Sequence, residues 1–360
     1  MTDREALIAL NSIGGIGPVR VRKIKECLGS YREVFFKGLS VLERKDILTQ
    51  TLVEKIQKLP KDWLDKELAL VKKNKIRVIT IEDEDYPESL KSIQSPPLVL
   101  YVLGGGSLTG ISGIAIVGSR RASLYGRETA EHYGWYFSNQ GLTVISGLAR
   151  GIDSAAHRGA LSAQGETIAV LGSGLGHMYP PENRDLAQKI QNQGLLISEF
   201  SMMTPPLPKN FPKRNRIISA LAKGVIVVEA ARRSGSLITM QYAKKQGKKT
   251  FAIPGKLDSI TSQGALRLIK EGVCMLTHPE EVLEELNIKM LTKISMDNGS
   301  KEQQDDEFGL MEFIDHEGIQ VNALHQRTEL SIPLLTTRLT KLELMGKIRQ
   351  LPGQIYVRRK

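Results

Sequence analysis

The sequence predicts an α/β protein in which a doubly wound, mainly parallel sheet follows a small helical domain and precedes a winged-helix-like domain. Three observations predict this arrangement. Residues 1–75 show helical periodicity, residues 76–288 alternate short apolar segments with helical patterns, and residues 307–360 follow a polar segment at 289–306. Strands that alternate with helices are typical of a parallel sheet with helices on both faces.

The first domain, 1–75, is expected to be of the SAM or helix-hairpin-helix type. Residues 13–18, IGGIGP, lie between two helical patterns, and residues 48–73 are expected to form a further, continuous amphipathic helix. The second pattern carries four basic residues, Arg20, Arg22, Lys23 and Lys25. Such a glycine hairpin lets a helix N-terminus approach a DNA phosphate. A plain Gly-Pro turn in a helical bundle, with the basic side chains in solvent, explains the same residues.

The middle domain, 76–288, contains short apolar runs that we expect to be strands. Runs rich in Val, Ile and Leu suit strands that are buried on both faces of a sheet. The predicted strands are Arg77–Thr80, Val99–Val102, Gly113–Val117, Thr143–Ser146, Thr167–Leu171, Leu195–Ser198, Val225–Glu229 and Thr250–Ile253. Ligands bind beyond the carboxyl ends of such strands, so the segments that follow them are candidate binding loops.

The last part of the chain is expected to be a linker at 289–306 and a winged-helix-like domain at 307–360. This domain shows a helical pattern near Leu334–Leu344 and two short strands around Pro352-Gly353. In a winged helix, that helix contacts duplex DNA. A protein-docking module of the same shape is the alternative, and the scarcity of basic residues on the helix favours it slightly.

Composition narrows the class of protein. The formal net charge is +11 and the sequence pI is about 9.5, which favours nucleic acid or an acidic surface as a partner. Two cysteines give no disulfide framework, the N-terminus lacks the layout of a signal peptide, and no apolar run suits a membrane span. We therefore expect a cytoplasmic protein without membrane contact.

The segment from Thr204 to Lys256 concentrates positive charge. Glu229 is its one acidic residue, against twelve Lys and Arg residues. Ser234-Gly235-Ser236 follows a predicted strand and precedes a helical pattern, where backbone N–H groups can bind an anion. This imbalance and this loop indicate a phosphate-rich partner.

Phe211 lies among basic residues in a proline-rich stretch. The flanking basic residues are Lys209, Lys213, Arg214 and Arg216. Single-stranded nucleic acid needs cations for its backbone and an aromatic face for a base, and this stretch supplies both. A core position for Phe211 is the alternative interpretation.

Two further strand-to-helix turns are candidate phosphate sites. Gly118-Ser119-Arg120 combines a glycine that permits close backbone approach with an arginine that can bind a phosphate through two N–H groups. The turn at 147–151, GLARG, is also rich in glycine. No P-loop or complete dinucleotide-binding motif is present, and the six His residues lack metal-ligand spacing. We therefore expect neither cofactor nor metal.

Asp153, Ser154 and His157 suggest a hydrolase triad at first sight. All three fall at the start of one predicted helix, and no G-x-S-x-G elbow surrounds a serine. Helix capping and packing explain them better. We predict no catalytic residue.

Long motifs resemble the DNA-processing protein A family, which includes the Smf proteins. They cover about residues 86–273 in the family's order. The matching segments are VGSRRAS-YG at 117–126, GLTVISGLARGIDSAAHRGAL at 141–161, TIAVLGSGL at 167–175, LLISEF at 195–200, FPKRNRIISAL at 211–221 and VVEAARRSGSLIT at 227–239, followed by FAIPG at 251–255. The helical front and the winged-helix-like tail match a common family layout.

The resemblance implies an extended Rossmann-like domain that binds single-stranded DNA and forms a homodimer. It also implies that the protein loads the recombinase RecA onto incoming single strands in natural transformation, in place of single-strand-binding protein, without cofactor or bond-making chemistry. The DNA-binding residues that it implies are Gly118, Ser119, Arg120, Gly147, Ala149, Lys209, Phe211, Arg214, Asn215, Arg216, Ser234, Gly235 and Ser236.

Three positions depart from the family pattern. Gly176-His177 replaces a common aspartate, Ser201-Met202 replaces a usual Pro-Gly pair, and Arg267 replaces a common asparagine. These departures affect the detailed shape of the pocket, not the basic-aromatic stretch.

Two other functions are compatible with parts of the sequence. A Rossmann-like nucleotide N-glycosidase would use Arg120 with Glu229 acting on a ribosyl group, although the basic segment and the third domain argue against a mononucleotide substrate. A structural adaptor would dock through its C-terminal domain and have no affinity for nucleic acid.

Overall fold

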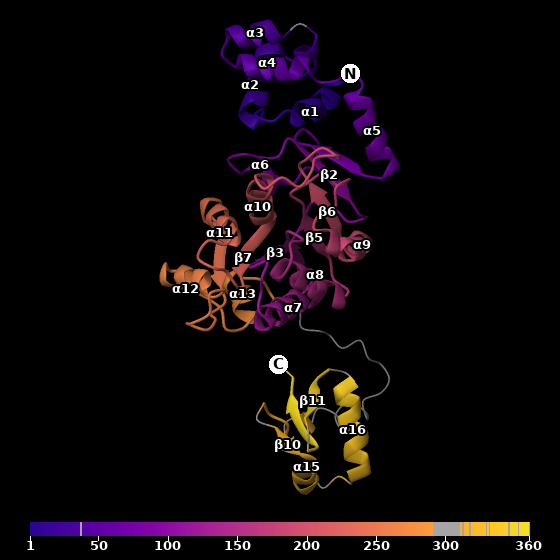
Figure 1. Ribbon diagram of the computed structural model, residues 1–360, viewed down its shortest axis with the longest axis vertical. Coiled ribbons are helices and arrows are strands. Elements are labelled where there is room, and N and C mark those ends of the chain that lie inside the picture. The colour runs from indigo at the N-terminus through magenta and orange to yellow at the C-terminus, as the bar shows by residue number, and fades with distance from the viewer. Residues whose placement is uncertain are drawn as a thin grey trace. The chain divides into compact units, whose positions relative to one another are not determined.

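The computed structural model describes residues 1–36, 38–290, 310–311, 313–316, 318–328, 330, 332–344, 346–351 and 353–359 (Figure 1). They belong to two compact units, Met1–Leu291 and Thr292–Lys360. Almost all of the predicted linker lies outside the described residues, and the predicted domain boundaries stay a prediction.

A mostly parallel sheet forms the centre of the first unit. Within the described residues it has nine strands in the order β1-β2-β6-β5-β4-β3-β7-β8-β9. The strands are β1 Arg77–Thr80, β2 Val99–Leu103, β3 Gly113–Val117, β4 Thr143–Ser146, β5 Thr167–Val170, β6 Leu195–Ser198, β7 Ala222–Val227, β8 Lys249–Ala252 and β9 Cys274–Met275. Only the β1–β2 and β2–β6 pairs among them are antiparallel. The predicted fold class is confirmed.

Helices cover both faces of this sheet because strand side chains alternate between two cores. Ile114 and Ile116 of β3 pack with α7 (Leu124–Asn139) and α8 (Ile152–Ser162). Ala115 and Val117 belong instead to the core that contains α10 (Asn210–Leu221), α11 (Ser236–Lys245) and α12 (Gln263–Lys270). The remaining helices of this region are α6 Glu88–Lys91, η2 Pro181–Asn183, α9 Arg184–Gln193 and α13 Glu280–Glu285.

The strand order reverses between β3 and β7. The chain moves outward from β3 through β4, β5 and β6, and α10 then returns it to β7, which pairs with β3 on the other side. The β3–α7 turn, the β4–α8 turn and the start of α10 therefore all lie at the carboxyl edge of the parallel strands, where such sheets bind ligands.

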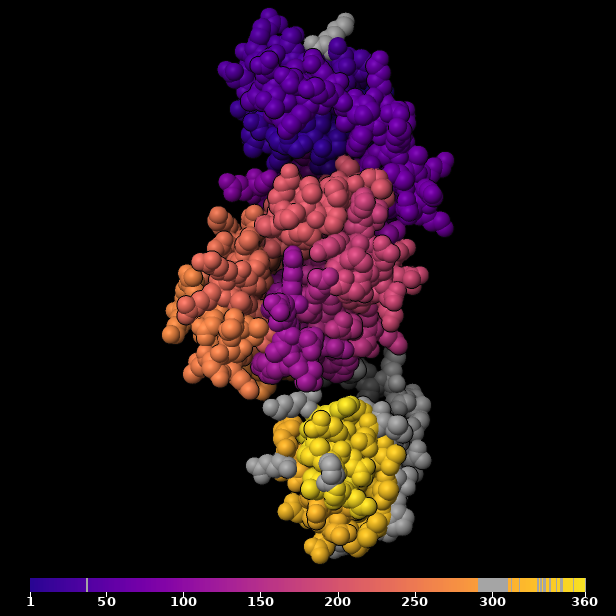
Figure 2. Space-filling model, viewed as in Figure 1, coloured from indigo at the N-terminus to yellow at the C-terminus, as the bar shows by residue number. Residues whose placement is uncertain are grey.

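The N-terminal helices pack onto the sheet region and share a hydrophobic core with it. They appear in indigo and violet in Figures 1 and 2, next to the sheet region. They are α1 Asp3–Asn11, α2 Pro18–Leu28, η1 Arg32–Phe35, α3 Leu39–Arg44, α4 Gln50–Gln57 and α5 Trp63–Lys73. Several hydrogen bonds join the regions; among them, Asn11 Nδ2 donates to Glu199 O at 2.9 Å, and Met202 N donates to Glu67 Oε1 at 2.8 Å.

Two local predictions were wrong. The expected continuous helix at 48–73 is two helices, α4 and α5, with Pro60 between them, because proline cannot continue a helix interior. The strand predicted at Val225–Glu229 is β7, which begins earlier, at Ala222, and contains Gly224. The short strand β9 was not predicted.

Among its described residues, the second unit contains the helices α15 and α16 and a small sheet. The order of that sheet is β10-β12-β11, and all its pairs are antiparallel. The elements are β10 Ile319–Gln320, α15 Val321–Thr328, α16 Ile332–Leu344, β11 Ile348–Leu351 and β12 Ile355–Arg358. Leu324, Leu335 and Leu339 are fully buried in its own core. The helix α16 and the strands β11 and β12 correspond to the predicted helix and wing.

Candidate nucleic-acid interface

The β3–α7 turn presents Arg120 to solvent. Ser119 N donates to Glu229 O at 2.7 Å, and Ser119 Oγ accepts from Arg121 N at 3.1 Å. A Cβ atom at Gly118 would lie 2.5 Å from Ile152 and 2.9 Å from the Glu229 carbonyl oxygen, so this close approach requires glycine. The turn is thus held by its backbone, which leaves the Arg120 side chain exposed.

Phe211 lies in the first turn of α10 and contacts Arg120. The Arg120 guanidinium carbon is 5.1 Å from the centroid of the Phe211 ring, within the range of a cation–π contact. The ring also lies 5.6 Å from the ring of Tyr179, and a Cβ atom at Gly172 would come within 2.7 Å of it. Phe211 is therefore half-buried rather than a core residue.

These residues line a small hollow at the carboxyl edge of the sheet. Its lining consists of Arg120, Gly147, Ala149, Arg150, Tyr179, Pro180 and Phe211. Lys209, which precedes α10, is exposed. The structure thus brings together residues from the turns after β3, β4 and β5 and from the start of α10.

The β4–α8 turn uses its backbone amides internally. Asp153 Oδ2 accepts from Gly147 N at 3.1 Å and from Ala149 N at 3.4 Å. Leu148 and Gly151 have φ angles of 56° and 76°, so the turn is left-handed at both positions. The Gly147 and Ala149 amides were expected to meet a phosphate, but in this structure the buried Asp153 carboxylate accepts from both.

Arg214 is buried beneath this turn. Its Nη1 donates to Gly147 O at 2.7 Å and also to Val170 O, so one guanidinium joins the ends of β4 and β5. Burial lowers the pKa of Arg214 to about 10, and the Asp153 carboxylate opposes that shift. In the opposite direction, burial raises the pKa of Asp153 while Arg214 opposes the rise. Two buried opposite charges therefore support the turn.

Arg216 and Asn215 also point inward. Arg216 donates to both oxygens of Glu199, at 2.9 and 2.6 Å, and to Ser95 O at 2.9 Å. Asn215 Nδ2 donates to Gly235 O at 3.2 Å, which ties α10 to the β7–α11 loop. The side chains of Arg214, Asn215 and Arg216 were expected on the DNA, and the structure instead uses them to position the segment that carries Phe211.

Ser234, Gly235 and Ser236 lie away from the lining of this hollow. The hydroxyls of Ser234 and Ser236 are 2.8 Å apart and bond to each other at the start of α11. Ser234 lines a different groove, together with Arg232 and Arg233. The structure therefore does not place the serine loop around the Arg120–Phe211 pair.

The Glu229 carboxylate bonds to the N-terminal end of α7. Its carboxylate accepts from Ser123 N at 2.9 Å, from Ser123 Oγ at 2.6 Å and from Thr261 Oγ1 at 3.2 Å. Ser123 is the N-cap residue of α7, so Glu229 fixes the start of the helix that follows Arg120. Three hydrogen bonds thus hold the Glu229 carboxylate at the start of α7.

The apparent triad does not assemble. Asp153 bonds to backbone amides, Ser154 Oγ donates to Ala149 O at 2.5 Å, and His157 Nδ1 lies 2.7 Å from Thr167 Oγ1. The described residues hold no group of three His, Cys, Asp or Glu side chains able to bind a metal. In those same parts of the chain, no helix combines the length and apolar character of a membrane span.

Sequence reasoning missed Arg150 and Tyr179 as members of the hollow. Arg150 follows Ala149 and is exposed, where it pairs with Glu182. Tyr179 precedes Pro180 in a loop without a recognised motif, and its contact with Phe211 depends on the distance between β5 and α10. Only the position of Arg150 within the glycine turn gave a usable signal.

The positions that depart from the expected family pattern lie in two different environments. Gly176 N donates to Met202 O at 2.9 Å, and Met202 is buried, so these two departures meet in one packed contact. Arg267 forms an exposed ion pair with Glu271 at 2.7 Å. None of these residues lines the hollow around Arg120.

Comparison with known proteins gives the class of this protein. A family model described as DNA recombination-mediator protein A matches residues 77–287, and a model of the DprA winged helix domain matches residues 297–354. Protein Smf of Escherichia coli K12 is 38% identical over 318 residues, which cover 86% of this chain and 85% of that protein. The fold is thus a Rossmann-like domain followed by a winged helix domain.

Solved structures agree with this class. The structure of DNA processing protein A from Streptococcus pneumoniae matches with a TM-score of 0.69 and 34% identity, over 79% of this chain and 98% of that one. DNA processing protein A from Helicobacter pylori, a structure described for its single-stranded DNA binding mode, matches with a TM-score of 0.53 and 28% identity, over 59% and 96% of the two chains. The chain belongs to the DNA recombination-mediator protein A family.

The buried His157 predicts a pH-dependent stability. Burial, followed by the nearby Arg214 charge, lowers the pKa of His157 to about 3 from its ordinary 6.5. The unfolded chain therefore binds a proton below pH 6.5 that the folded chain does not, and the stability present above this pH is lost as the pH falls. We expect this residue to lower the free energy of unfolding by about 1.4 kcal/mol per pH unit in that range.

Urea unfolding of the wild type and of His157→Gln between pH 7 and pH 5 checks this expectation. The glutamine variant lacks the titrating group, so its stability should decline less steeply on acidification, whatever its stability at pH 7. Parallel pH profiles for the two proteins would contradict the assignment.

Proposed function

We propose that this protein is a recombination mediator that binds single-stranded DNA at the hollow around Arg120 and Phe211. The observation that carries the proposal is the exposed Arg120 guanidinium held against the face of the half-buried Phe211 ring. One polar, cationic group and one aromatic face then occupy the same small hollow, in a protein whose net charge is +11.

The hollow has a volume of only about 10 Å³, so a nucleotide would contact the groups at its mouth rather than enter it. Arg120 and the exposed Lys209 supply cations for phosphates, and the Phe211 and Tyr179 rings supply apolar faces for a base. Stacking of a base on an aromatic side chain contributes about 1–3 kcal/mol and tolerates any base, which suits a protein that binds strands of any sequence. A duplex offers no free base to such a hollow.

The inward-pointing residues have a supporting part in this proposal. Arg214 holds the ends of β4 and β5 together, and Arg216 anchors α10 to Glu199. Gly118 and Gly147 permit the close packing around them. Their substitution would weaken DNA binding through loss of geometry, whereas substitution of Arg120 or Lys209 would remove a direct contact. Ser234, Gly235 and Ser236 would meet the strand only beyond the hollow.

Family membership supports the rest of the proposal. A recombination mediator in natural transformation would act in the cytoplasm, load RecA onto the incoming strand and displace or bypass single-strand-binding protein. The winged helix domain would serve as a docking or DNA-contact module. A homodimer would bring two such hollows to one strand.

Loss of Arg120 is expected to weaken single-strand binding without regard to sequence. Fluorescence anisotropy of a labelled oligo-dT should show about tenfold weaker binding for Arg120→Ala, because a charge-assisted contact to phosphate is lost. The binding constant should also depend less on salt, with a slope reduced by about 0.7 for the phosphate no longer neutralised.

Lys189→Ala is the matched control, since Lys189 is an exposed cation on α9 outside the lining of the hollow. It should bind the oligonucleotide almost as the wild type does. Equal effects of the two substitutions would mean that only overall charge matters. An unlabelled duplex that competes as well as oligo-dT would contradict single-strand preference.

Recombinase loading is expected to depend on the same hollow. In an assay of ATP hydrolysis by RecA on a single strand coated with single-strand-binding protein, the wild type should shorten the lag before hydrolysis. Arg120→Ala should shorten it much less, because it cannot hold the strand. An unchanged lag with the wild-type protein would refute loading while leaving DNA binding intact.

The homodimer has a candidate surface. Leu257 and Ile260 are 81% and 78% exposed, next to α12. We expect Leu257→Asp/Ile260→Asp to convert a dimer to a monomer in size-exclusion chromatography with light scattering. A wild-type monomer, or a dimer that survives both substitutions, would disprove this surface.

A further inference from the structure

A second cavity lies between the N-terminal helices and the sheet region of the first unit, apart from the hollow around Arg120. Its volume is about 420 Å³, which is in the range of small-molecule sites. Its lining consists of Ser12, Ile13, Gly14, Lys55, Lys58, Leu59, Pro60, Trp63, Glu67, Ser201, Met203, Thr204 and Pro205. No residue is shared with the hollow around Arg120.

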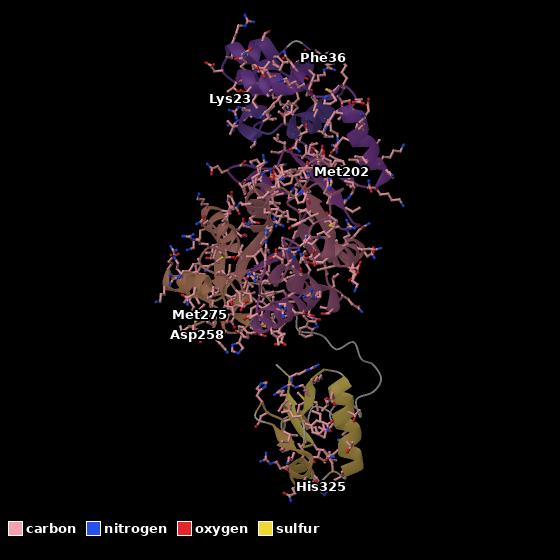
Figure 3. All side chains as sticks on the ribbon, viewed as in Figure 1. Lys23, Phe36, Met202, Asp258, Met275 and His325 are labelled. Atoms are coloured by element: carbon pink, nitrogen blue, oxygen red, sulfur yellow. The ribbon has the colours of Figure 1, made fainter. Side chains whose placement is uncertain are left out.

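The walls of this cavity are fixed relative to each other. Met202, labelled in Figure 3 where the N-terminal helices meet the sheet region, donates its N–H to Glu67. Asn11 donates to Glu199 O close by, and Gly174 N donates to Thr204 O at 2.9 Å. Both sides of the cavity also belong to one hydrophobic core. The cavity is therefore a preformed part of the first unit.

Glu67 is the one buried charged residue in the lining, with 4% of its surface exposed. Its Oε1 accepts a hydrogen bond from Met202 N at 2.8 Å, and the Tyr101 side chain also bonds to the Glu67 carboxylate. A carboxylate has about four acceptor positions, so capacity for a ligand donor remains. Burial, and then the proximity of Glu67, raise the pKa of the neighbouring Tyr101 well above its ordinary value.

The rim of the cavity carries positive charge. Lys55 and Lys58 are exposed cations, and Trp63, the first residue of α5, is half-buried with the cavity beside it. Lys55 Nζ contacts Gly14 O at 3.3 Å, and Lys58 pairs with Glu54 at 3.4 Å in an exposed ion pair of the kind that contributes little. Each ammonium group has three N–H donors and both side chains are exposed, so both can still donate to an anion.

We propose that this cavity binds one nucleotide unit. The base would stack on Trp63, an exocyclic amino group would donate to Glu67, and the phosphate would meet Lys55 and Lys58. An acceptor-only carboxylate recognises the amino group of cytosine, adenine or guanine. Thymine has no such group, so the site should prefer amino-bearing bases.

The unit can come from a free nucleoside monophosphate or from a nucleic-acid strand, and both present the same chemistry. Ser201, Met203, Thr204 and Pro205 line the cavity, and the chain continues from them to Lys209 and Phe211. A strand that is bound at both places would follow this segment. The inference does not depend on the hollow around Arg120.

Tryptophan fluorescence provides a direct test. Trp63 and Trp135 are the two tryptophans of the chain, and Trp135 lies on α7 and is 44% exposed. In the full-length Trp135→Phe protein, Trp63 is the sole reporter. Titration with dCMP should quench it saturably, and dTMP should bind about tenfold more weakly.

Two variants identify the groups that bind. Lys58→Ala, at the exposed rim, should weaken dCMP and dTMP to a similar degree, because it removes a phosphate contact common to both. Glu67→Gln should abolish the preference for dCMP, because its amide no longer offers two equivalent acceptors. Circular dichroism verifies folding of the glutamine variant, and Lys58→Ala keeps the test decisive if that variant unfolds.

An oligo-dC and the Arg120→Ala background separate the two sources and the two proposals. Quenching by dCMP and oligo-dC alike indicates a unit taken from a strand as well, and quenching by dCMP alone indicates a free nucleotide; either result supports the site. Quenching that persists in Arg120→Ala, although oligo-dT binding is weakened, shows that the two sites are independent. Absence of quenching by millimolar dCMP, or equal affinity of wild type, Lys58→Ala and Glu67→Gln, would overturn the proposal.

Discussion

The buried pair of Arg214 and Asp153 supports the carboxyl edge of the sheet. Arg214 donates to the carbonyl oxygens of Gly147 and Val170, and Asp153 accepts from the amides of Gly147 and Ala149. The two side chains thereby bind opposite polar groups of one turn. Without them, the backbone groups at the ends of β4 and β5 would be buried without partners, which is costly. Each charge also needs the other, since removal of one partner leaves an uncompensated buried charge.

The Arg214–Asp153 pair fixes the backbone beneath the hollow, while other basic residues stay exposed to solvent. Arg120 and Lys209 carry exposed charge, while the charges of Arg214 and Arg216 are taken up by carbonyls and by Asp153 and Glu199. The hollow thus has a rigid base and a few free cations at its rim. Successive phosphates of a strand can contact such exposed cations in turn. A buried arginine cannot make these contacts, because its side chain does not reach the strand.

The N-terminal helices are joined to the sheet region by a second set of polar contacts. Glu67 bonds to Met202, and Met202 in turn accepts from Gly176 through its carbonyl oxygen, so helices and sheet loops share one hydrogen-bonded contact. The cavity beside it is lined by residues of the N-terminal helices and by residues of the loop that contains Met202.

The regular elements and the family followed from the residues, whereas the inward or outward direction of the basic side chains did not. Buried parallel strands are short β-branched runs between glycines, so Gly113–Val117, Thr143–Ser146 and Leu195–Ser198 could be placed from local pattern. Arg120 could be placed because a turn after a strand exposes it.

Arg214 and Arg216 looked equally available, because a linear pattern shows a charge but not its partner. Asp153 and Gly147 meet Arg214 across more than sixty positions of chain, and Tyr179 reaches Phe211 only where β5 and α10 come together. Burial and partnership are properties of such distant contacts, and folding of the whole sheet assigns them.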